Sequence, residues 1–266
     1  MFKKLFLAIL LLLTTHNTGF AANQNDNLLN AAVNGSVHLA EKALANGADV
    51  NYAPPYRLSP LTIATKNKKY ELVRLLLDKG ADPNLAVNNG FSTDTPLLYS
   101  IYNNDSKIAE LLLLNGADPN QGRLVHKQLH IDIPLRNPNT HHSNKKSYDI
   151  NYQLTVTPQM RSYGATPLIY AIQKDGTDNP SLEMVNLLLN NGAIPNKAND
   201  YGYTPLMATA DLQLVSRKFI RLDIAKLLLD KGANPKHEDN YGNTALNFAS
   251  STRFKEIADV LLPYLN

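Results

Sequence analysis

Dense apolar runs recur along the chain, and each is about as long as one short helix. One run, LVRLLL, extends from Leu72 to Leu77, and others contain Leu187–Leu189 and Leu227–Leu229. A helix that is apolar over so much of its surface has to be covered on two sides. Shorter apolar segments lie between the runs. The pattern therefore predicts pairs of short helices that cover one another when the pairs stack in an array.

Two short signatures mark where these helices begin and end. A hydroxyl residue followed by Pro-Leu begins the first helix of a pair, because the hydroxyl oxygen accepts free amide groups and proline has no amide hydrogen to leave unpaired. Gly-Ala ends the second helix, where a left-handed residue is needed. The first signature starts at Ser59, Thr95, Thr166 and Thr204, with a degenerate form at Thr244, and the second starts at Gly47, Gly80, Gly116, Gly192 and Gly232.

Together these signatures resemble the ankyrin repeat family. The segment SPLTIATKNKKYELVRLLLDKGADPN carries the family's TPL element in the form Ser-Pro-Leu, and the segment TPLLYSIYNNDSKIAELLLLNGADPN carries it unchanged; the family period is about 33 residues. The resemblance implies an all-α solenoid of about six helix-turn-helix units with short β-hairpin fingers. The family's histidine after TPL is absent, which we expect to loosen the turn that this histidine usually ties. Its place is taken by Thr62, Leu98, Ile169, Met207 and Asn247.

The repeats are assigned to residues of about 26–51, 52–84, 85–120, 163–196, 197–236 and 237–262, within a domain of residues 23–266. The first repeat lacks Thr-Pro and the last stops at Pro263. Terminal repeats are expected to be atypical because one of their faces meets water.

Extra residues interrupt the period at four places. Three fall near Asn88 to Ser92, thirty-eight between Asn120 and Tyr163, five near Asp175 to Pro180, and seven near Leu214 to Ile220. The long insertion, residues 121–162, alternates polar and apolar residues in two stretches and has a polar centre, so we expect one long hairpin-like excursion. Six basic and two acidic residues give it a local charge of +4.

The N-terminus has the layout of a secretory signal. Lys3 and Lys4 precede nine unbroken apolar residues, and Gly19-Phe20-Ala21 has the small-x-small form that precedes cleavage. Nine apolar residues are about half of the roughly 20 that a membrane helix needs. We therefore expect residues 1–22 to be removed and the mature chain to lie in the periplasm, without a membrane span. An uncleaved membrane tether is the alternative.

Composition limits the function classes. Charged residues make up 18% of the chain, and the formal net charge is +3 before and +1 after removal of residues 1–22. No nucleic-acid partner is expected, because such proteins carry a strong basic excess. The chain has no cysteine, which excludes disulfides and a thiol nucleophile.

No pattern typical of catalysis or of a cofactor site is present, so we expect neither enzymatic activity nor a cofactor. Four of the seven histidines lie in the long insertion, and imidazoles can hold Zn²⁺ or Cu²⁺. However, His126 and His130 stand four residues apart, which suits a helix rather than a strand. We interpret them as solvated loop residues, together with His141 and His142.

Aromatic residues mark a candidate surface for binding a partner. Three residues before each hydroxyl-Pro-Leu element or its equivalent stand Tyr56, Ser92, Tyr163, Tyr201 and Tyr241. The resemblance places these positions at fingertips, where tyrosines would give a large contact area; alternatively, Tyr-Gly is only a comfortable finger sequence. First-helix residues expected to face the partner include Lys66, Asn67, Asn103, Gln173, Asp211 and Leu212. The predicted partner-binding residues are Tyr56, Phe91, Tyr102, Tyr163, Lys174, Tyr201, Tyr203 and Tyr241.

Two functions remain open, and both follow from the resemblance rather than from a catalytic motif. The first is a non-catalytic protein-binding module that acts as scaffold or protective partner of an envelope protein. The second is an immunity protein that neutralises a toxin delivered into the periplasm, such as a phospholipase; release into a host cell is a weaker third. The expected partner is another protein, of acidic character if it meets the insertion, and the expected state is a monomer.

Overall fold

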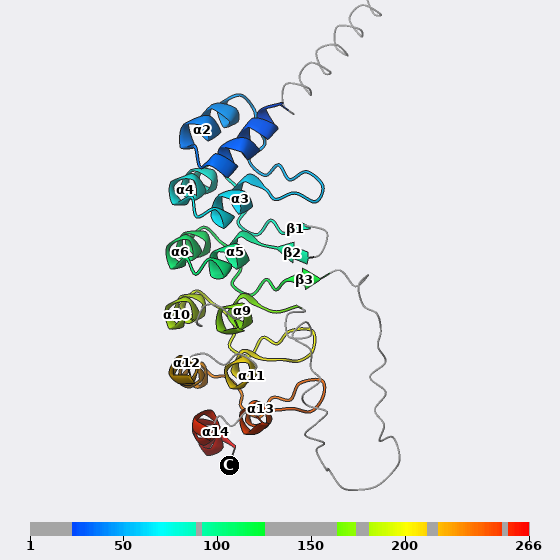
Figure 1. The fold of residues 1–266 in the computed structure, drawn as a ribbon, viewed down its shortest axis with the longest axis vertical. Helices are drawn as coiled ribbons and strands as arrows, with labels where there is room; N and C mark the ends of the chain where they lie inside the picture. The colour runs from blue at the N-terminus through cyan, green and yellow to red at the C-terminus, as the bar shows by residue number, and fades with distance from the viewer. Residues whose placement is uncertain are drawn as a thin grey trace, which may run out of the picture. The chain divides into compact units, whose positions relative to one another are not determined.

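The computed structural model describes residues 23–88, 92–125, 164–173, 181–211, 218–251 and 255–265. The chain divides into two compact units. Unit 1 comprises Met1–Gln121 and Glu183–Ala193, and unit 2 comprises Gly122–Leu182 and Ile194–Asn266. Within each unit, inner helices lie between outer helices on one side and the connecting fingers on the other (Figure 1).

Unit 1 is built from stacked helix pairs. Inner helix α3 contacts α5, and outer helix α4 contacts both α2 and α6. In the finger before α5, β1 pairs with β2 in antiparallel register, with Val87 opposite Asp94. The elements are a helix over residues 23–34, α2 (Val37–Ala45), α3 (Pro60–Lys66), α4 (Tyr70–Asp78), β1 (Val87–Asn88), β2 (Ser92–Asp94), α5 (Pro96–Tyr102), α6 (Ser106–Leu114) and, from its second residue, α10 (Leu182–Asn190).

Unit 2 repeats the same arrangement. Inner helix α11 contacts both α9 and α13, and outer helix α12 contacts α14. Its elements are β3 (Leu124–Val125), α9 (Pro167–Gln173), α11 (Pro205–Ala210), α12 (Lys218–Asp230), α13 (Ala245–Ser251), α14 (Lys255–Leu261) and the 3-10 turn η2 (Leu262–Tyr264).

The core follows from the apolar runs. In α4, Leu72, Val73 and Leu76 are buried while Arg74 is exposed. Buried positions three and four residues apart share one side of a helix, so one stripe of α4 is covered by α3 and by the flanking outer helices. Leu228 of α12 has the same place in unit 2 and is also fully buried.

The predicted helix starts are confirmed where the caps can be seen. The hydroxyl oxygens of Ser59, Thr95 and Thr204 each accept the amide three residues on, at 3.3 Å. Such an N-cap bond satisfies one of the amide groups that a helix start leaves free.

In three repeats, another side chain holds the turn where the family histidine is absent. The Asn247 side-chain oxygen accepts both the amide and the hydroxyl of Thr244 at 2.8 Å. The Met207 sulfur accepts the Thr204 amide at 3.4 Å, and the Thr62 and Ser59 hydroxyls lie 2.9 Å apart. The predicted loosening is therefore wrong for these three repeats, because another polar atom occupies the place of the imidazole. Leu98 and Ile169 offer no such atom.

Asparagines at the end of several repeats join the repeat to the next one. Asn84 donates to the Gly116 carbonyl at 2.8 Å, and its side-chain oxygen accepts the Asp118 amide at 2.7 Å. Asn51 and Asn196 make the same pair of bonds within their own units. The glycine carbonyl is free to accept because the glycine, at φ 85 in the case of Gly80, has already ended the outer helix.

The aspartate of the GAD stretches stabilises a turn, as its recurrence predicts. Asp49, Asp82 and Asp118 each accept the amide two residues on, at 2.8–2.9 Å, and Asn234 does the same at 2.9 Å. In the fourth repeat the position holds Ile194, whose side chain has no acceptor and is 51% exposed.

Replacing Ile194 by aspartate is expected to raise the free energy of unfolding by about 0.5–1.5 kcal/mol, the net value of one hydrogen bond. The new carboxylate can accept the Asn196 amide, and little apolar burial is lost. Thermal melting measures the change, and Asp82→Ile is the reverse substitution and should lower the melting temperature. A lower melting temperature for Ile194→Asp would contradict this interpretation of the turn.

The fifth repeat departs from the others. The seven extra residues were expected in the connection between its helices, yet α12 has 13 residues where α4, α6 and α10 have 9, so part of the extra length is an added helical turn. Inner helix α11 is one residue shorter than α3, and its C-cap, Asp211, is extended with ψ 110. Residues 212–217 lie outside the described residues.

The added turn brings Arg221 into the core, where its side chain is 2% exposed. Its Nη1 donates to the Ala208 carbonyl at 2.8 Å and to the Asp211 carbonyl at 3.4 Å, so the guanidinium pairs with carbonyls at the end of α11. Burial lowers the pKa of Arg221, and electrostatic interaction with Tyr203 and Asp211 opposes this shift. The departure in helix length thus creates a buried polar cluster.

Candidate protein-binding surface

The fingers of unit 2 are tight turns, each stabilised by hydrogen bonds from backbone amides to an asparagine or aspartate side chain. The Asn199 side-chain oxygen accepts the amides of Tyr201 and Tyr203 at 2.9 and 3.0 Å. In the next finger, Asp239 accepts the Tyr241 amide at 2.9 Å. The residue after each tyrosine is a glycine at positive φ, 75 for Gly202 and 79 for Gly242. The Tyr-Gly pair therefore suits the finger backbone itself.

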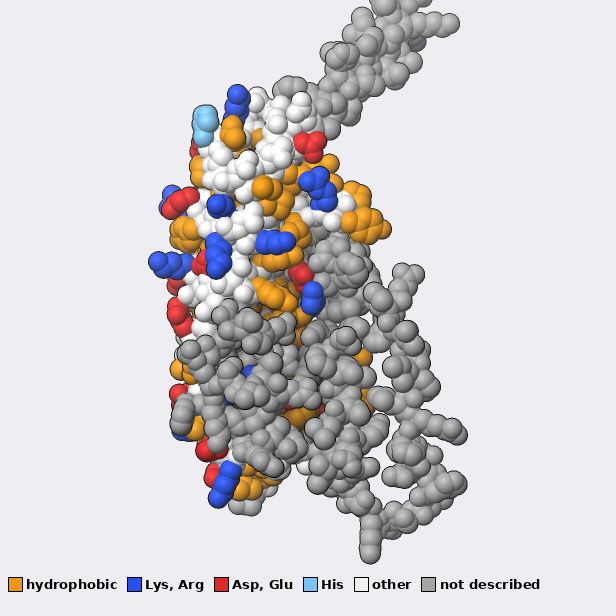
Figure 2. All heavy atoms as spheres, viewed as in Figure 1, with side chains coloured by type: hydrophobic (Ala, Val, Ile, Leu, Met, Phe, Trp, Pro, Cys, Tyr) orange, Lys and Arg blue, Asp and Glu red, His pale blue; other side chains and the backbone are white. Residues whose placement is uncertain are grey.

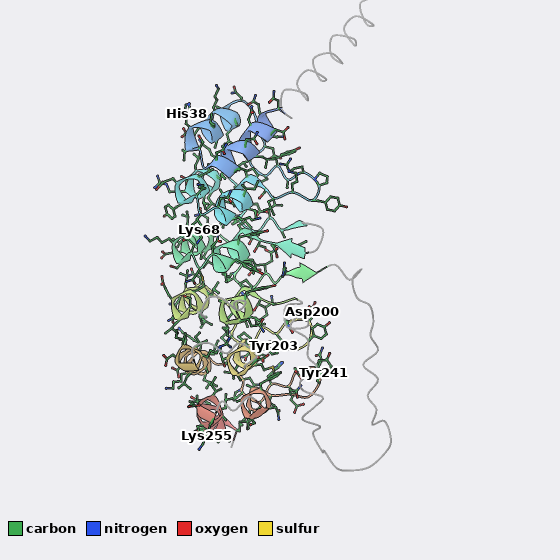
Figure 3. The ribbon with its side chains drawn as sticks, in the orientation of Figure 1. His38, Lys68, Asp200, Tyr203, Tyr241 and Lys255 are labelled. Atoms are coloured by element: carbon green, nitrogen blue, oxygen red, sulfur yellow. The ribbon has the colours of Figure 1, made fainter. Side chains whose placement is uncertain are left out.

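The tyrosines of these fingers are only partly exposed. Tyr201 and Tyr241 are half-buried, and Figure 3 shows Tyr241 and Asp200 on the finger loops. The backbone geometry explains Tyr-Gly at this place without a partner. The alternative given by the sequence, a comfortable finger sequence, thus gains support in unit 2.

The structure corrects the prediction for Tyr203. Its side chain is 3% exposed, its hydroxyl donates to the Asp211 carboxylate at 2.9 Å, and its ring meets Phe248 edge-on at 5.5 Å. Asp211, also expected on the partner-facing surface, is buried in the same cluster. Neither side chain offers contact area, because the finger turns the residue before the helix inward.

Tyr56 differs from Tyr201 and Tyr241. It is 72% exposed and has a φ of 60. The Arg57 amide donates to the Pro54 carbonyl at 3.0 Å, so residues 54–57 form a β-turn with Pro55 and Tyr56 at its centre. Proline fixes a negative φ at the second position, and a positive φ at the third defines a type II turn, in which glycine or asparagine is usual.

The inner helices of unit 1 present a lysine beside aromatic rings. The Lys66 ammonium lies 5.8 Å from the centre of the Tyr99 ring, within cation–π range. Tyr102, three residues on along α5, is 45% exposed. Asn103 donates to the carbonyls of Thr65 and Lys66 at 3.0 Å, so this predicted contact residue also holds adjacent repeats together. We name Lys66, Tyr99 and Tyr102 the inner patch.

Five of the described inner helices differ in charge from the outer helices, whereas the helix over residues 23–34 carries Asp26. Helices α3, α5, α9, α11 and α13 contain no acidic residue, and Lys66 is the one charged residue among them. Outer helices carry acids, for example Glu71 and Asp78 in α4 and Glu110 in α6. The carboxylate that follows α5, Asp105, accepts the Ile108 amide as an N-cap. Figure 2 shows basic, acidic and apolar side chains on one face of unit 1.

Several predicted contact residues lie outside the described residues, namely Phe91, Tyr163, Lys174 and Leu212. The same holds for the insertion histidines His126, His130, His141 and His142. Gln173 is half-buried and Asn67 is exposed, with its amide donating to the Val33 carbonyl at 3.3 Å. Their part in binding stays a prediction.

The two ends of the long insertion meet in unit 2. The Arg123 amide donates to the Ala165 carbonyl at 3.1 Å, and a Cβ added to Gly122 would lie 2.7 Å from the Gly164 carbonyl oxygen. The Arg123 guanidinium donates to the Tyr170 hydroxyl at 3.0 Å. The chain therefore leaves and re-enters the repeat at one point.

Replacing residues 124–162 by a short Gly-Ser linker is expected to preserve the fold, because the ends already meet and each halving of a loop changes its closure free energy by only about 0.6 kcal/mol. Circular dichroism melting should give a transition as cooperative as that of the full chain. Gly122→Ala provides the contrast and should lower the melting temperature, since its methyl group meets a backbone carbonyl. Loss of the transition in the deletion variant would show that the insertion is part of the core.

Within the described residues, no group of three or more potential metal ligands comes together. None of the described helices has both the length and the apolar character needed to cross a bilayer.

The pairs of short helices, their fingers and their hydrogen-bonded asparagines define a helical repeat protein of the ankyrin class. A model of ankyrin repeats, in three copies, matches residues 6–87, 28–123, 141–239 and 178–266. The chain belongs to the ankyrin repeat family. Its fold is the all-α repeat solenoid that the resemblance implies, and the family's general role is that of a protein-interaction module.

Individual relatives agree on the fold. The ankyrin repeat protein YahD of Escherichia coli K12 is 27% identical over 176 residues, which are 66% of this chain and 84% of YahD. An ankyrin repeat domain from Acinetobacter baumannii AYE superposes with a TM-score of 0.65 at 24% identity, covering 89% of this chain and 96% of that one. A chain in the complex of the predatory endopeptidase Bd0816 of Bdellovibrio bacteriovorus with immunity protein Bd3460 gives a TM-score of 0.61 at 22% identity, covering 89% and 97%.

Proposed function

We propose that this protein is a non-catalytic binding module of the periplasm that serves as scaffold or protective partner of another envelope protein. The observation that carries the proposal is a family fold whose inner helices in unit 1 expose an aromatic and basic surface, Lys66 with Tyr102, rather than burying it. Aromatic side chains such as tyrosine are enriched where proteins meet. The signal-like N-terminus supports the location.

The location is tested by fractionating cells that express the full chain and sequencing the N-terminus of the recovered protein. We expect the periplasmic fraction to contain a chain that starts at Ala22 or Asn23. Recovery of the chain in the cytosol with Met1 intact would overturn the periplasmic proposal.

The binding role is tested by immobilising the mature chain and passing periplasmic extract over it. A variant with Lys66→Glu and Tyr102→Ala is immobilised on a second column as the control. A protein that both columns retain counts as background. We expect one protein to be retained by the wild type and lost with the variant. If both columns retain the same proteins, the inner patch is not the binding surface.

An immunity function is the second candidate, and one comparison favours it. A structure of similar fold is that of a complex between a predatory endopeptidase and its immunity protein. At 22% identity this likeness concerns the fold, so the role is carried over here only as a proposal. Such a protein would bind a toxin that enters the periplasm and block its active site.

The two candidates differ in what the chain does to its partner. For an immunity protein, adding the mature chain to the captured partner should abolish that partner's enzymatic activity at equimolar ratio. For a protective partner, activity should persist while thermal inactivation of the partner slows. A basic insertion would speed association with an acidic partner in a salt-dependent way in either case.

A further inference from the structure

The finger before α3 carries a strained residue at its tip. Tyr56 has a φ of 60 in a turn that glycine or asparagine would occupy without strain. A bulky residue in the left-handed region is an outlier. The fingers of unit 2 use Gly202 and Gly242 for their positive φ, so this finger gives up stability to present a tyrosine.

The turn also holds the backbone of Tyr56 in one conformation. Pro55 precedes it with a fixed φ, the Pro54 carbonyl accepts the Arg57 amide, and Tyr56 is 72% exposed. A tyrosine has few side-chain torsions and loses little conformational entropy when a partner covers it. Backbone strain of this kind clusters at ligand-binding and active sites.

The inner patch is close enough to Tyr56 for one bound segment to contact both. Helix α3 has seven residues, which span about 10 Å at 1.5 Å per residue. The three residues from Tyr56 to Ser59 add at most about 10 Å. An extended segment of about six residues would therefore reach from Tyr56 to Lys66.

The charges of this region determine which charge a bound segment should carry. Residues 51–58 and helices α3 and α5 carry Arg57 and Lys66 and no carboxylate. We infer that residues 54–57 and the inner patch form one docking site for an extended acidic segment of a partner protein, with Tyr56 as its preset anchor. Carboxylates of that segment pair with Arg57 and Lys66, and its apolar or aromatic side chains pack on Tyr56 and Tyr102. This inference rests on the proposed binding function and names the chemistry of the partner.

The test uses the mature chain and a soluble random copolymer of glutamate and tyrosine as probe, with a copolymer of lysine and tyrosine as the control for charge. Fluorescence anisotropy should detect binding of the acidic copolymer that weakens as salt is added, and no comparable binding of the basic one. Equal binding of both copolymers would overturn the inference.

Tyr56→Gly separates anchoring from folding. It should weaken binding of the acidic copolymer at least about tenfold and raise the melting temperature by about 2 °C or more, because strain is removed. Tyr56→Phe keeps the ring and the strained backbone and should behave as the wild type in both respects. Asn104→Gly, which also replaces a residue at positive φ, should leave binding unchanged.

Wild-type binding by Tyr56→Gly, or a lower melting temperature for it, would contradict the preset anchor. Lys66→Gln should weaken binding mainly at low salt, and Lys66→Arg should restore it. These results stand apart from the proposed function, because the chain could still be periplasmic and hold a partner if the copolymer experiments failed. In that case the docking site would be elsewhere on the protein.

Discussion

Replacing Leu76 by alanine is expected to lower the free energy of unfolding by about 2–5 kcal/mol, the range for truncating a buried leucine. Leu76 is fully buried in α4, which contacts α2, α3 and α6. The lost side chain leaves a cavity between repeats, and repeats are stable only through such contacts. Urea unfolding of the mature chain measures the effect, and Leu228→Ala in α12 should give a loss of similar size.

Leu114→Ala is the matched control. Leu114 ends helix α6 and is 73% exposed, so its truncation removes almost no burial and should change stability by less than about 0.5 kcal/mol. Equal losses for Leu76→Ala and Leu114→Ala would mean that the register of the repeats is wrong.

The second large effect is expected at Asp211. Replacing it by asparagine removes a negative charge that, after Tyr203, acts on the buried Arg221 guanidinium, and it keeps the shape of the side chain. Removing the negative charge that compensates a buried cation costs up to about 3–5 kcal/mol, because the remaining charge stays buried without compensation. Thermal and urea unfolding should both show the loss, and Asp223→Asn on the exposed side of α12 should show almost none.

A double variant tests whether the two charges act together. Arg221→Met combined with Asp211→Asn removes both charges and should be more stable than the sum of the two single losses predicts. Strict additivity of the two single substitutions would show that Arg221 depends on the carbonyls of Ala208 and Asp211 alone.

Helix positions could be predicted from the sequence because they depend on local chemistry. The apolar run from Leu72 to Leu77 and the N-cap at Ser59 act within one repeat, and the glycine at position 80 has no alternative residue that adopts φ 85 as easily. Each of the two signatures occurs five times, and the copies reinforce one another. The recurring aspartate of the GAD stretches was explained in the same way, by a bond to its own chain.

The fingers were harder to predict because residue spacing does not say which side of a turn a side chain takes. The spacing groups Tyr203 with exposed tyrosines, yet the residue before the N-cap is buried in α5, α9, α11 and α13. Ala165 and Asn243 occupy this place in neighbouring repeats and are buried as well. A comparison of the residues just before the hydroxyl-Pro-Leu element in the different repeats could have indicated that Tyr203 lies in the core.

Arg221 could not be predicted because its burial depends on a change in helix length. The spacing of the signatures assigns the seven extra residues of the fifth repeat to a connection, where an arginine would be solvated. The added helical turn instead sets Arg221 against the end of the shortened α11. The strain at Tyr56 is equally invisible in a sequence, since Pro-Pro-Tyr-Arg is compatible with other turn types.

Titrating the captured partner with three forms of the mature chain measures whether this protein binds its partner through the inner side of unit 1. The first is the wild type, the second carries Tyr56→Gly, Lys66→Glu and Tyr102→Ala, and the third carries Lys107→Gln, Glu110→Gln and Leu114→Ala on outer helix α6. We predict that calorimetry gives equal affinities for the first and third forms and a loss of at least about 100-fold for the second, as expected when more than one anchor is removed. Equal affinity of all three forms, or a loss confined to the third, would contradict the account.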